Sequence, residues 1–322
     1  MQKYFKYILL FLLIPSFAAL ASLLPIKIPA WLQLISYLSP YLFNLGLLLF
    51  IFLEKKILAL FVCVLNVVSI SNLFNYAGNN KSVKSSIRIL SLNCNQLKQG
   101  NVDITTLANE ISKSNPDIVC FQEFGVKQNW IDKKGVDQYL KNTFIDYPYI
   151  VFSREFNNIY GLAILSKFPV IDTEELLLPT SIMNGIVKHS VVIHRDTLSV
   201  FNVHLYSFNQ PKFSVRNSIK AIKKQHAELE SIINNSSSKK TILAGDFNFP
   251  AYGFSYNKIT ANYKDSFYKS NLIFGSTLQN IMLPWRIDYQ FYADQLTCVD
   301  FNISSTAISD HKLTLGEFSI NN

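Results

Sequence analysis

Residues 241–250 read Thr-Ile-Leu-Ala-Gly-Asp-Phe-Asn-Phe-Pro, and the interpretation of the whole chain starts from this stretch. Its first four residues are mostly apolar, which predicts a buried strand, and Gly245 allows the backbone to turn where that strand ends. Asp246 and Asn248 are two residues apart, so their side chains share one face of an extended chain. A carboxylate there can hold or deprotonate a water molecule, and an amide can donate to an anionic oxygen. Taken alone, the stretch fits a strand followed by an Asx turn equally well.

Hydrophobic patterning predicts many strands and few helices in the remainder of the chain. Helical spacing indicates helices at 102–114, with Asn101 as a candidate N-cap, and at 214–234. Many β segments with two or three helices in about 240 residues are typical of an α+β fold or of a four-layered sandwich, in which two sheets pack together beneath outer helices. The expected strands are 87–93, 117–122, 149–152, 161–166, 186–194, 197–205, 241–244, 285–292 and 311–318.

Polar residues of a few chemical types lie at or near the ends of these expected strands. A rigid sheet positions such residues, and the adjoining loops leave them accessible to a ligand. A divalent cation such as Mg²⁺ prefers one or two carboxylates, with water or phosphate oxygens at its other positions, and Glu123 is the best single candidate ligand. The candidate residues are Asn93, Glu123, His204, Asp246, Asn248, Asp288, Asp310 and His311.

Seven short motifs carry a resemblance to a known family. In chain order they are Leu-Asn-Cys-Asn at 92–95, Phe-Gln-Glu at 121–123, Gly-Leu-Ala-Ile-Leu-Ser at 161–166, Phe-Asn-Val-His-Leu at 201–205, Gly-Asp-Phe-Asn at 245–248, Arg-Ile-Asp-Tyr at 286–289 and Ser-Asp-His at 309–311. Together they resemble the endonuclease/exonuclease/phosphatase superfamily over about residues 86–320. The resemblance implies a four-layered α/β sandwich of two mixed sheets and metal-dependent hydrolysis of phosphoesters.

The same resemblance implies a role for each candidate residue. Glu123, helped by Asn93, is expected to hold Mg²⁺ or Mn²⁺, and Asp310 is an accessory metal or water ligand. Asp246 is expected to activate the attacking water, while Asn248 binds the phosphate. Asp288 orients His311, which donates to the charge that develops on the phosphate.

Two further residues bear on the branch of the superfamily. His204 resembles the histidine that contacts the phosphate or the leaving group in deoxyribonuclease-like and sphingomyelinase-like enzymes. Asn95 stands where the abasic-site endonucleases have an acid, which leaves a second metal contact open. The other histidines, His189, His194 and His226, match no motif and are expected to be solvated.

The sequence leaves the substrate open. The favoured hypothesis is a nuclease. One alternative is a phosphodiesterase or phosphatase that acts on phospholipid head groups, and the other is a catalytically inactive membrane-binding or scaffold protein. The basic residues Lys212, Arg216, Lys220, Lys223 and Lys224 cluster on or near one predicted helix, which is more often an ordinary solvated face than a nucleic-acid surface. No protein partner is predicted.

The N-terminal part of the chain differs sharply in composition. Apolar runs at 5–24, 31–53 and 57–77 are each about 20 residues long, enough to cross a hydrocarbon core of about 30 Å. A cleaved signal peptide could explain only the first run, and buried core helices are the other alternative. We therefore expect a three-helix transmembrane anchor at 1–77, a polar linker at 78–86 and the catalytic domain at 87–322.

The charge distribution favours one membrane orientation. The chain carries a net charge of +8, and five Lys residues against one Glu lie within residues 1–77. Basic residues beside apolar runs usually mark the cytoplasmic side, so this excess is a topology signal rather than a nucleic-acid footprint. Lys3, Lys6, Lys55 and Lys56 would lie inside the cell, which predicts an integral membrane protein with an extracytoplasmic catalytic domain and a lipid bilayer as a partner.

Overall fold

The structure is a computed structural model, and its residues divide into two compact units, each described by itself below. One unit comprises Met1–Phe74, Ser207–Leu229 and Phe249–Ala261, and the other Asn75–Tyr206, Glu230–Asn248 and Asn262–Asn322. The larger, second unit contains all the strands named below. The described residues are 14, 16–18, 20, 21, 28–39, 41, 45, 56–71, 74, 86–97, 103–125, 140–154, 160–176, 184–207, 214–236, 238–270, 272, 273, 275–279 and 285–321.

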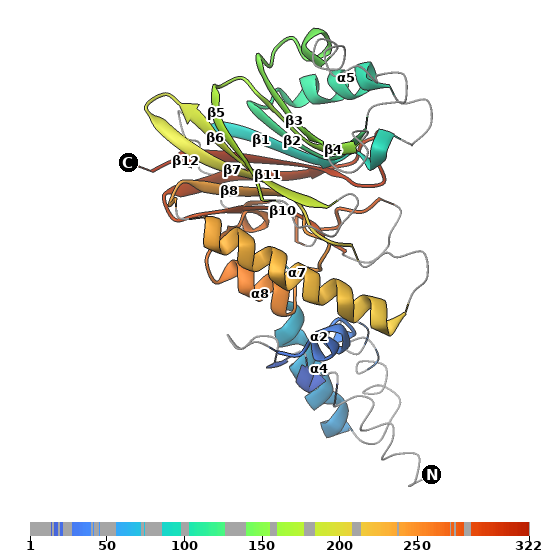
Figure 1. Ribbon diagram of the computed structural model, residues 1–322. Coiled ribbons are helices and arrows are strands. Elements are labelled where there is room, and N and C mark those ends of the chain that lie inside the picture. Colours follow the sequence, from blue (N-terminus) through green and yellow to red (C-terminus); the bar gives the residue numbers. More distant parts are fainter. Residues whose placement is uncertain are drawn as a thin grey trace. The chain divides into compact units, whose positions relative to one another are not determined.

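Two six-stranded sheets form the second unit (Figure 1). The first sheet has the order β11-β12-β1-β2-β4-β3, in which β1 and β2 are parallel and the other neighbours are antiparallel. Its strands are β1 (Ile87–Asn93), β2 (Ile118–Gly125), β3 (Tyr149–Arg154), β4 (Tyr160–Ser166), β11 (Leu296–Ser304) and β12 (Leu313–Ile320).

The second sheet repeats this plan. Its order is β5-β6-β7-β8-β10-β9, and β7 and β8 are its parallel pair. Both sheets are therefore mixed, and each has one parallel pair at its centre. The strands are β5 (Val170–Glu175), β6 (Gly185–Ile193), β7 (Asp196–His204), β8 (Thr241–Asp246), β9 (Lys264–Asp265) and β10 (Asp288–Tyr292).

Each parallel pair is joined by a helical crossover, as parallel strands require. The α5 helix (Ile104–Ser114) connects β1 to β2, and α7 (Val215–Asn235) connects β7 to β8. The Asp103 side chain accepts a hydrogen bond from the Thr106 amide at 2.8 Å, so Asp103, and not Asn101, caps α5. Asn115 ends the same helix with a left-handed backbone, at φ 41°.

The core of the second unit has two apolar layers, because the central strands are buried on both faces. Ile87 and Ile89 of β1 join residues of the second sheet, such as Val200 and Ile242, in the layer between the sheets. Alternate residues of the first sheet's strands, such as Leu90 and Val119, point the other way, into a second layer. That layer includes three residues of the crossover helix α5, namely Ile104, Leu107 and Ile111. Figure 1 shows α5 over the outer face of the first sheet.

All nine expected strands and both expected helices are present, some with boundaries shifted by a few residues. The strand expected at 285–292 begins at Asp288, and the strand expected at 311–318 is Leu313–Ile320. The sequence analysis missed β5, β9, β11, the 3-10 helix η4 (Ser266–Lys269) and the helix α8 (Phe254–Thr260). The two mixed sheets with helices nevertheless agree with the expected α/β sandwich class.

The first unit contains α2 (Ala30–Ser36), α4 (Lys56–Ile70), α8 and the first part of α7. A buried polar network joins three of these helices. The Gln33 side chain of α2 donates to Ser255 Oγ of α8 at 2.7 Å, and its Oε1 atom lies 2.6 Å from Nε2 of His226 in α7. His226 is therefore buried and hydrogen bonded, and the expectation that it is solvated is wrong.

The predicted membrane anchor requires correction. In the part of the chain that the structure describes, no helix is both long enough and apolar enough to cross a membrane. Within the run at 57–77, α4 has 15 residues and spans about 22 Å, less than a hydrocarbon core of about 30 Å. The predicted integral-membrane localisation is contradicted by this finding. Most of the runs at 5–24 and 31–53 lies outside the described residues, and the domain boundaries at 77 and 86 stay predictions.

Candidate active site

Three candidate residues lie side by side at one end of the second sheet. His204 is opposite Asp246 in the parallel pairing of β7 and β8, and Asp288 is opposite Asp246 in the antiparallel pairing of β8 and β10. Each of the three is at most 3% exposed. The sheet register therefore places one imidazole and two carboxylates in a row, although they are 42 residues or more apart in the chain.

The glycine before Asp246 makes this row possible. Gly245 has φ +149°, and a Cβ atom built on it would lie 1.9 Å from the Val203 carbonyl oxygen of β7. Any side chain at this position would push the two strands apart immediately before His204 and Asp246. Gly245 is therefore needed for close approach of β7 and β8, and the turn expected at this residue is not observed, because β8 continues through it to Asp246.

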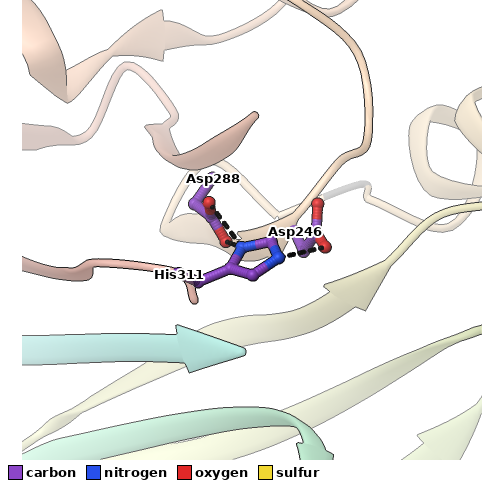
Figure 2. Close-up of side chains that lie close together, drawn as sticks. All are labelled: Asp246, Asp288 and His311. Carbon is purple, nitrogen blue, oxygen red and sulfur yellow. Dashed lines mark hydrogen bonds and ion pairs between the residues drawn. The ribbon is translucent and has the colours of Figure 1, made fainter. Parts of the chain in front are cut away.

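His311 is held against Asp288. Its Nδ1 atom lies 3.1 and 3.0 Å from the two carboxylate oxygens of Asp288, and its Nε2 atom faces Asp246 Oδ2 at 3.9 Å. Figure 2 shows the ring between the two carboxylates. Because the Nδ1–H group donates to Asp288, the ring is fixed with Nε2 on the Asp246 side.

The surroundings of Asp246 and His311 shift the pKa values of both side chains away from their ordinary values. Burial, reinforced by repulsion from Asp288, raises the pKa of Asp246 to about 6. Burial alone would lower the pKa of His311, but attraction to Asp288, the hydrogen bond to it and attraction to Asp246 raise that pKa to about 10. At neutral pH the pair consists of an ionised Asp246 that can still accept a proton and an imidazolium at His311.

Asn93 and Glu123, from the central strands of the first sheet, complete the same site. Asn93 Nδ2 donates to Asp246 Oδ2 at 3.0 Å, and it lies 3.5 Å from Glu123 Oε1. The register of β2 and β4 shifts between Phe121 and Phe124, so Glu123 lies in a β-bulge, with φ +45°. Bulges and left-handed non-glycine residues are typical of places where a strand aims a functional side chain.

His204 lies between the contributions of the two sheets. Its Nε2 atom is 3.7 Å from Glu123 Oε1 and 3.7 Å from Asp246 Oδ2. Its Nδ1 atom is buried and has no hydrogen-bond partner among the described residues. This environment differs from that of a core histidine with both ring nitrogens bonded, and it places the reactive Nε2 edge at the site.

Asn248 and Asp310 lie at the margin of the cluster. The Asn248 backbone amide donates to Asp246 Oδ1 at 2.9 Å, while its side-chain amide donates to the Leu205 carbonyl at 2.9 Å. Asp310 is exposed and accepts from Asn95 Nδ2 at 2.7 Å, and the Asn95 backbone amide donates to Asn93 Oδ1 at 3.0 Å. Asp310 is therefore linked to the cluster through Asn95.

All eight candidate residues thus lie in one connected network. The sequence analysis missed Gln96, which donates to Glu123 Oε2 at 3.3 Å directly after the Leu-Asn-Cys-Asn motif. It also missed Asn202 and Gln122, which are fully buried and join the sheets behind the site through a 2.7 Å hydrogen bond. Polar residues inside otherwise apolar strands are the one sequence signal that could have indicated them.

The donor atoms fit a divalent metal ion best at Glu123. Its carboxylate is partly exposed and makes only long hydrogen bonds, so its oxygens can still coordinate an ion. Asp246, Asp288 and His311 also offer ligand atoms within 4.8 Å of one another. Both oxygens of Asp288 already lie against His311 Nδ1, however, and Mg²⁺ prefers oxygen ligands to imidazole.

Comparison with known proteins supports the family resemblance. The model of the Endonuclease/Exonuclease/phosphatase family matches residues 90–311. No curated protein matches the chain.

Solved structures share the fold at low sequence identity. An endonuclease/exonuclease/phosphatase from Beutenbergia cavernae is similar with a TM-score of 0.61 and 16% identity, covering 74% of this chain and 72% of that one. TDP2 from D. rerio, complexed with a single-strand DNA product, has a TM-score of 0.53 and 19% identity, and the match covers 73% of this chain and 100% of that one. A 3′ phosphatase from Neisseria, bound to a product DNA hairpin, has a TM-score of 0.54 and 18% identity, and the match covers 72% of this chain and 99% of that one.

Proposed function

This chain belongs to the endonuclease/exonuclease/phosphatase family of phosphoester hydrolases, and we propose that it cleaves phosphodiester bonds in nucleic acids with the help of a divalent metal ion. The main support for this proposal is that polar side chains from both sheets lie together in one site. Asn93 and Glu123 come from the first sheet, His204, Asp246 and Asp288 come from the second, and His311 lies beside them. A phosphodiester is anionic and resists attack by water, so a catalyst must both neutralise its charge and hold the water in line.

Asp246 is the proposed general base. Its pKa of about 6 leaves it ionised at neutral pH, yet makes it a better proton acceptor than an ordinary carboxylate. Hydrogen bonds from Asn93 Nδ2 and from the Asn248 backbone amide fix its two oxygens. A water molecule beside Asp246 would lose its proton to the carboxylate as its oxygen bonds to phosphorus and the bond to the leaving oxygen breaks.

His311 and Asn248 are proposed to bind the phosphate. With its pKa near 10, His311 is cationic, and the hydrogen bond from Nδ1 to Asp288 leaves Nε2–H as the donor toward a phosphate oxygen. Asp288 itself would not exchange a proton, because its role is to fix the ring and its charge. The Asn248 amide adds a neutral donor that forms no ion pair with the product.

His204 is proposed to act at the phosphate or the leaving oxygen. Its Nε2 atom lies 3.7 Å from both Glu123 and Asp246, so a phosphate bound between these carboxylates would meet this edge of the ring. The imidazole could donate a proton to the departing alkoxide, which would otherwise be a poor leaving group.

Glu123 is the proposed principal ligand of the metal ion, with Asn93 and Asp310 in support. Enzymes of this family generally depend on divalent metals, and Mg²⁺ or Mn²⁺ suits a carboxylate and amide donor set. Such an ion would supply positive charge that stabilises the pentavalent transition state. The hydrogen bonds from Asn93 and Gln96 orient the Glu123 carboxylate for this task.

Nucleic acid is the proposed substrate because two of the solved structures with this fold contain product DNA. The test is turnover by the purified full-length protein on plasmid DNA, a generic aryl phosphodiester, an aryl phosphomonoester and sphingomyelin vesicles, each with Mg²⁺ and with excess EDTA. We expect plasmid cleavage and diester hydrolysis with Mg²⁺ and neither with EDTA. Release of phosphate from the monoester alone would indicate a phosphatase, and head-group release without DNA cleavage a lipid enzyme.

Matched substitutions tie the activity to the site. Asp246→Asn is expected to abolish turnover, whereas Asp196→Asn, at the opposite end of the neighbouring strand β7, should leave it unchanged. Diester hydrolysis that continues at the same rate in EDTA, or in Asp246→Asn, would refute the proposal.

A further inference from the structure

A short segment outside every motif binds both the backbone that carries Asp288 and the backbone that carries His311. This segment, Gly275–Gln279, follows η4 in the chain and precedes the Arg-Ile-Asp-Tyr motif. Thr277 at its centre is completely buried, although it belongs to no regular strand. A buried threonine outside regular structure needs partners for its hydroxyl and for both of its backbone groups.

On one side, Thr277 binds the backbone that carries Asp288. Its amide donates to the Trp285 carbonyl at 3.1 Å, and its hydroxyl oxygen accepts from the amides of Ile287 and Asp288 at 3.0 and 3.1 Å. A single hydroxyl thus satisfies two consecutive backbone donors, the second of which belongs to Asp288 itself. The start of β10 is fixed at that position.

On the other side, the same segment binds the loop that carries His311. The Thr277 carbonyl accepts from the Lys312 amide at 2.6 Å, Leu278 forms an antiparallel bridge with His311, and the Gln279 amide donates to the Asp310 carbonyl at 2.7 Å. The Gln279 side chain donates to the carbonyls of Thr306 and Ser309 at 2.5 and 2.6 Å, and to that of His311 at 3.4 Å. Each residue from 309 to 312 therefore has a backbone group bonded to this segment.

We infer that Thr277 and Gln279 are positioning residues for the reaction, and that they set the distance between Asp288 and His311. This inference rests on the proposed function for its catalytic meaning. Asp288 comes from a strand of the second sheet and His311 from the loop before β12 of the first sheet, so their separation depends on how the two backbones are connected. Segment 275–279 connects them by hydrogen bonds on both sides, with Thr277 shared between the two.

The expected consequence is a loss of turnover without a comparable loss of binding. Displacing a catalytic group by about 1 Å can cost about 10²-fold in rate. Thr277→Val keeps the shape of the side chain but leaves the Ile287 and Asp288 amides without an acceptor, so we expect kcat to fall about 10- to 100-fold with KM within about threefold. Thr277→Ser retains the hydroxyl and should restore most of the rate.

A matched control separates this role from general stabilisation. Thr241 is also fully buried, and its hydroxyl donates to the Ser238 carbonyl at 2.6 Å, at the end of β8 away from Asp246. Thr241→Val makes the same substitution at another fully buried threonine and removes a hydrogen bond between its hydroxyl and the backbone, and it should leave kcat unchanged. Gln279→Met, at a partly buried position, tests the loop side of the segment if Thr277→Val does not fold.

The kcat of a double variant tests whether Thr277 acts through His311. In a His311→Ala background, Thr277→Val should lower kcat no further, because residues that act as one unit are not additive. Equal losses from Thr277→Val in the presence and absence of His311 would show that Thr277 only supports the fold.

The deciding experiment does not depend on turnover. Long-range ¹H–¹⁵N spectra of the full-length protein resolve its five histidine rings, and His311→Gln identifies the signals of His311. We expect Thr277→Val or Gln279→Met to shift the His311 ring resonances and to speed exchange of its Nδ1 proton, and Thr241→Val to do neither. Unchanged His311 signals in both segment variants would overturn the inference. Absence of turnover in the wild type would instead count against the proposed function, and the spectra would still decide the role of the segment.

Discussion

The ends of the two central parallel strand pairs make different contributions to one site. The β7–β8 end supplies His204 and Asp246, both at most 3% exposed, and Asp288 and His311 lie against them. The β1–β2 end supplies Asn93 and Glu123, and Glu123 is partly exposed and lies in a bulge. The same strand-helix-strand plan thus yields a buried acid and histidine cluster on one side, and a partly exposed carboxylate beside a buried amide on the other.

We propose that this difference reflects a division of catalytic roles between the two ends. Burial strengthens electrostatic interactions around Asp246 and His311, and the raised pKa values of these two residues suit proton transfer and charge stabilisation. Exposure leaves Glu123 able to exchange water for an ion and for substrate oxygens. Asn93 connects the two ends, because it donates to Asp246 and lies within 3.5 Å of Glu123.

The largest effects are expected at the buried end. Asp246→Asn and His311→Ala should each lower kcat by about 10³-fold or more, because each removes a group that is proposed to act in the transition state. Steady-state kinetics on a diester substrate, combined with thermal unfolding, measures both consequences.

Asp246→Asn should also stabilise the folded protein at neutral pH. Because burial and Asp288 hold the pKa of Asp246 above its ordinary value of about 3.9, ionising this carboxylate destabilises the folded state as the pH rises from about 4 to about 6. The neutral amide avoids that cost. A Tm that is lower at pH 7.5 than in the wild type would show that the carboxylate is not electrostatically strained.

A smaller and different effect is expected at the exposed end. Glu123→Gln should lower kcat/KM about 10- to 100-fold and raise the Mg²⁺ concentration needed for half-maximal rate, because an amide is a weaker ligand than a carboxylate. Titration of activity with Mg²⁺ checks this expectation. If Glu123→Gln lost activity with no change in metal dependence, Glu123 would act together with the buried acid and histidine cluster and would not be the metal ligand.

Asn95→Asp tests for a metal contact at Asp310. The substitution keeps a residue type that tolerates the left-handed backbone at φ 44°, but it replaces the 2.7 Å amide donor to Asp310 with a second carboxylate. We expect Tm in EDTA to fall by about 2–4 °C, and Mg²⁺ to restore it by binding between the two acids. A Tm that does not respond to Mg²⁺ would exclude a metal contact at Asp310.

The smallest effect on activity is expected at His189, a buried histidine on β6 that belongs to none of the seven motifs. Burial lowers its pKa to about 3, and its Nδ1 atom lies 3.0 Å from Thr173 Oγ1. Because this pKa lies below the unfolded value of about 6.5, the unfolded chain takes up a proton first as the pH falls, and at pH 5 the folded state loses about 2 kcal/mol from this residue alone.

Urea unfolding of wild type and His189→Gln at pH 8 and pH 5 measures this loss. The variant should be less stable at pH 8 but less sensitive to acid, with unchanged kcat at pH 8. Parallel pH dependence in the two proteins would show that His189 is protonated without penalty.

The candidate site residues could be selected from the sequence because they lie at or near the ends of the expected strands. Gly245 and Asp246 mark the end of a buried strand, and an Asp next to His311 at a strand start is unusual enough to draw attention. The expected family and its class of phosphoester hydrolases are confirmed by the match over residues 90–311, whereas the individual catalytic roles stay predictions.

What the sequence could not predict depends on tertiary contacts. Thr277 resembles an ordinary loop residue until the fold brings the Asp288 amide close to its hydroxyl. His189 and His226 were expected to be solvated because they match no motif, yet each is buried and hydrogen bonded through its ring. Apolar length alone also led to the wrong expectation at 57–77, where α4 is only 15 residues long.

The most direct test of the account is a double-mutant cycle across the two ends, measured as kcat on one diester substrate at saturating Mg²⁺. If Glu123 and His311 act on the same phosphate in the same transition state, Glu123→Gln combined with His311→Ala should be little slower than the worse of the two single variants. Losses that simply multiply would mean that the two ends work independently, and the proposed single site would be wrong.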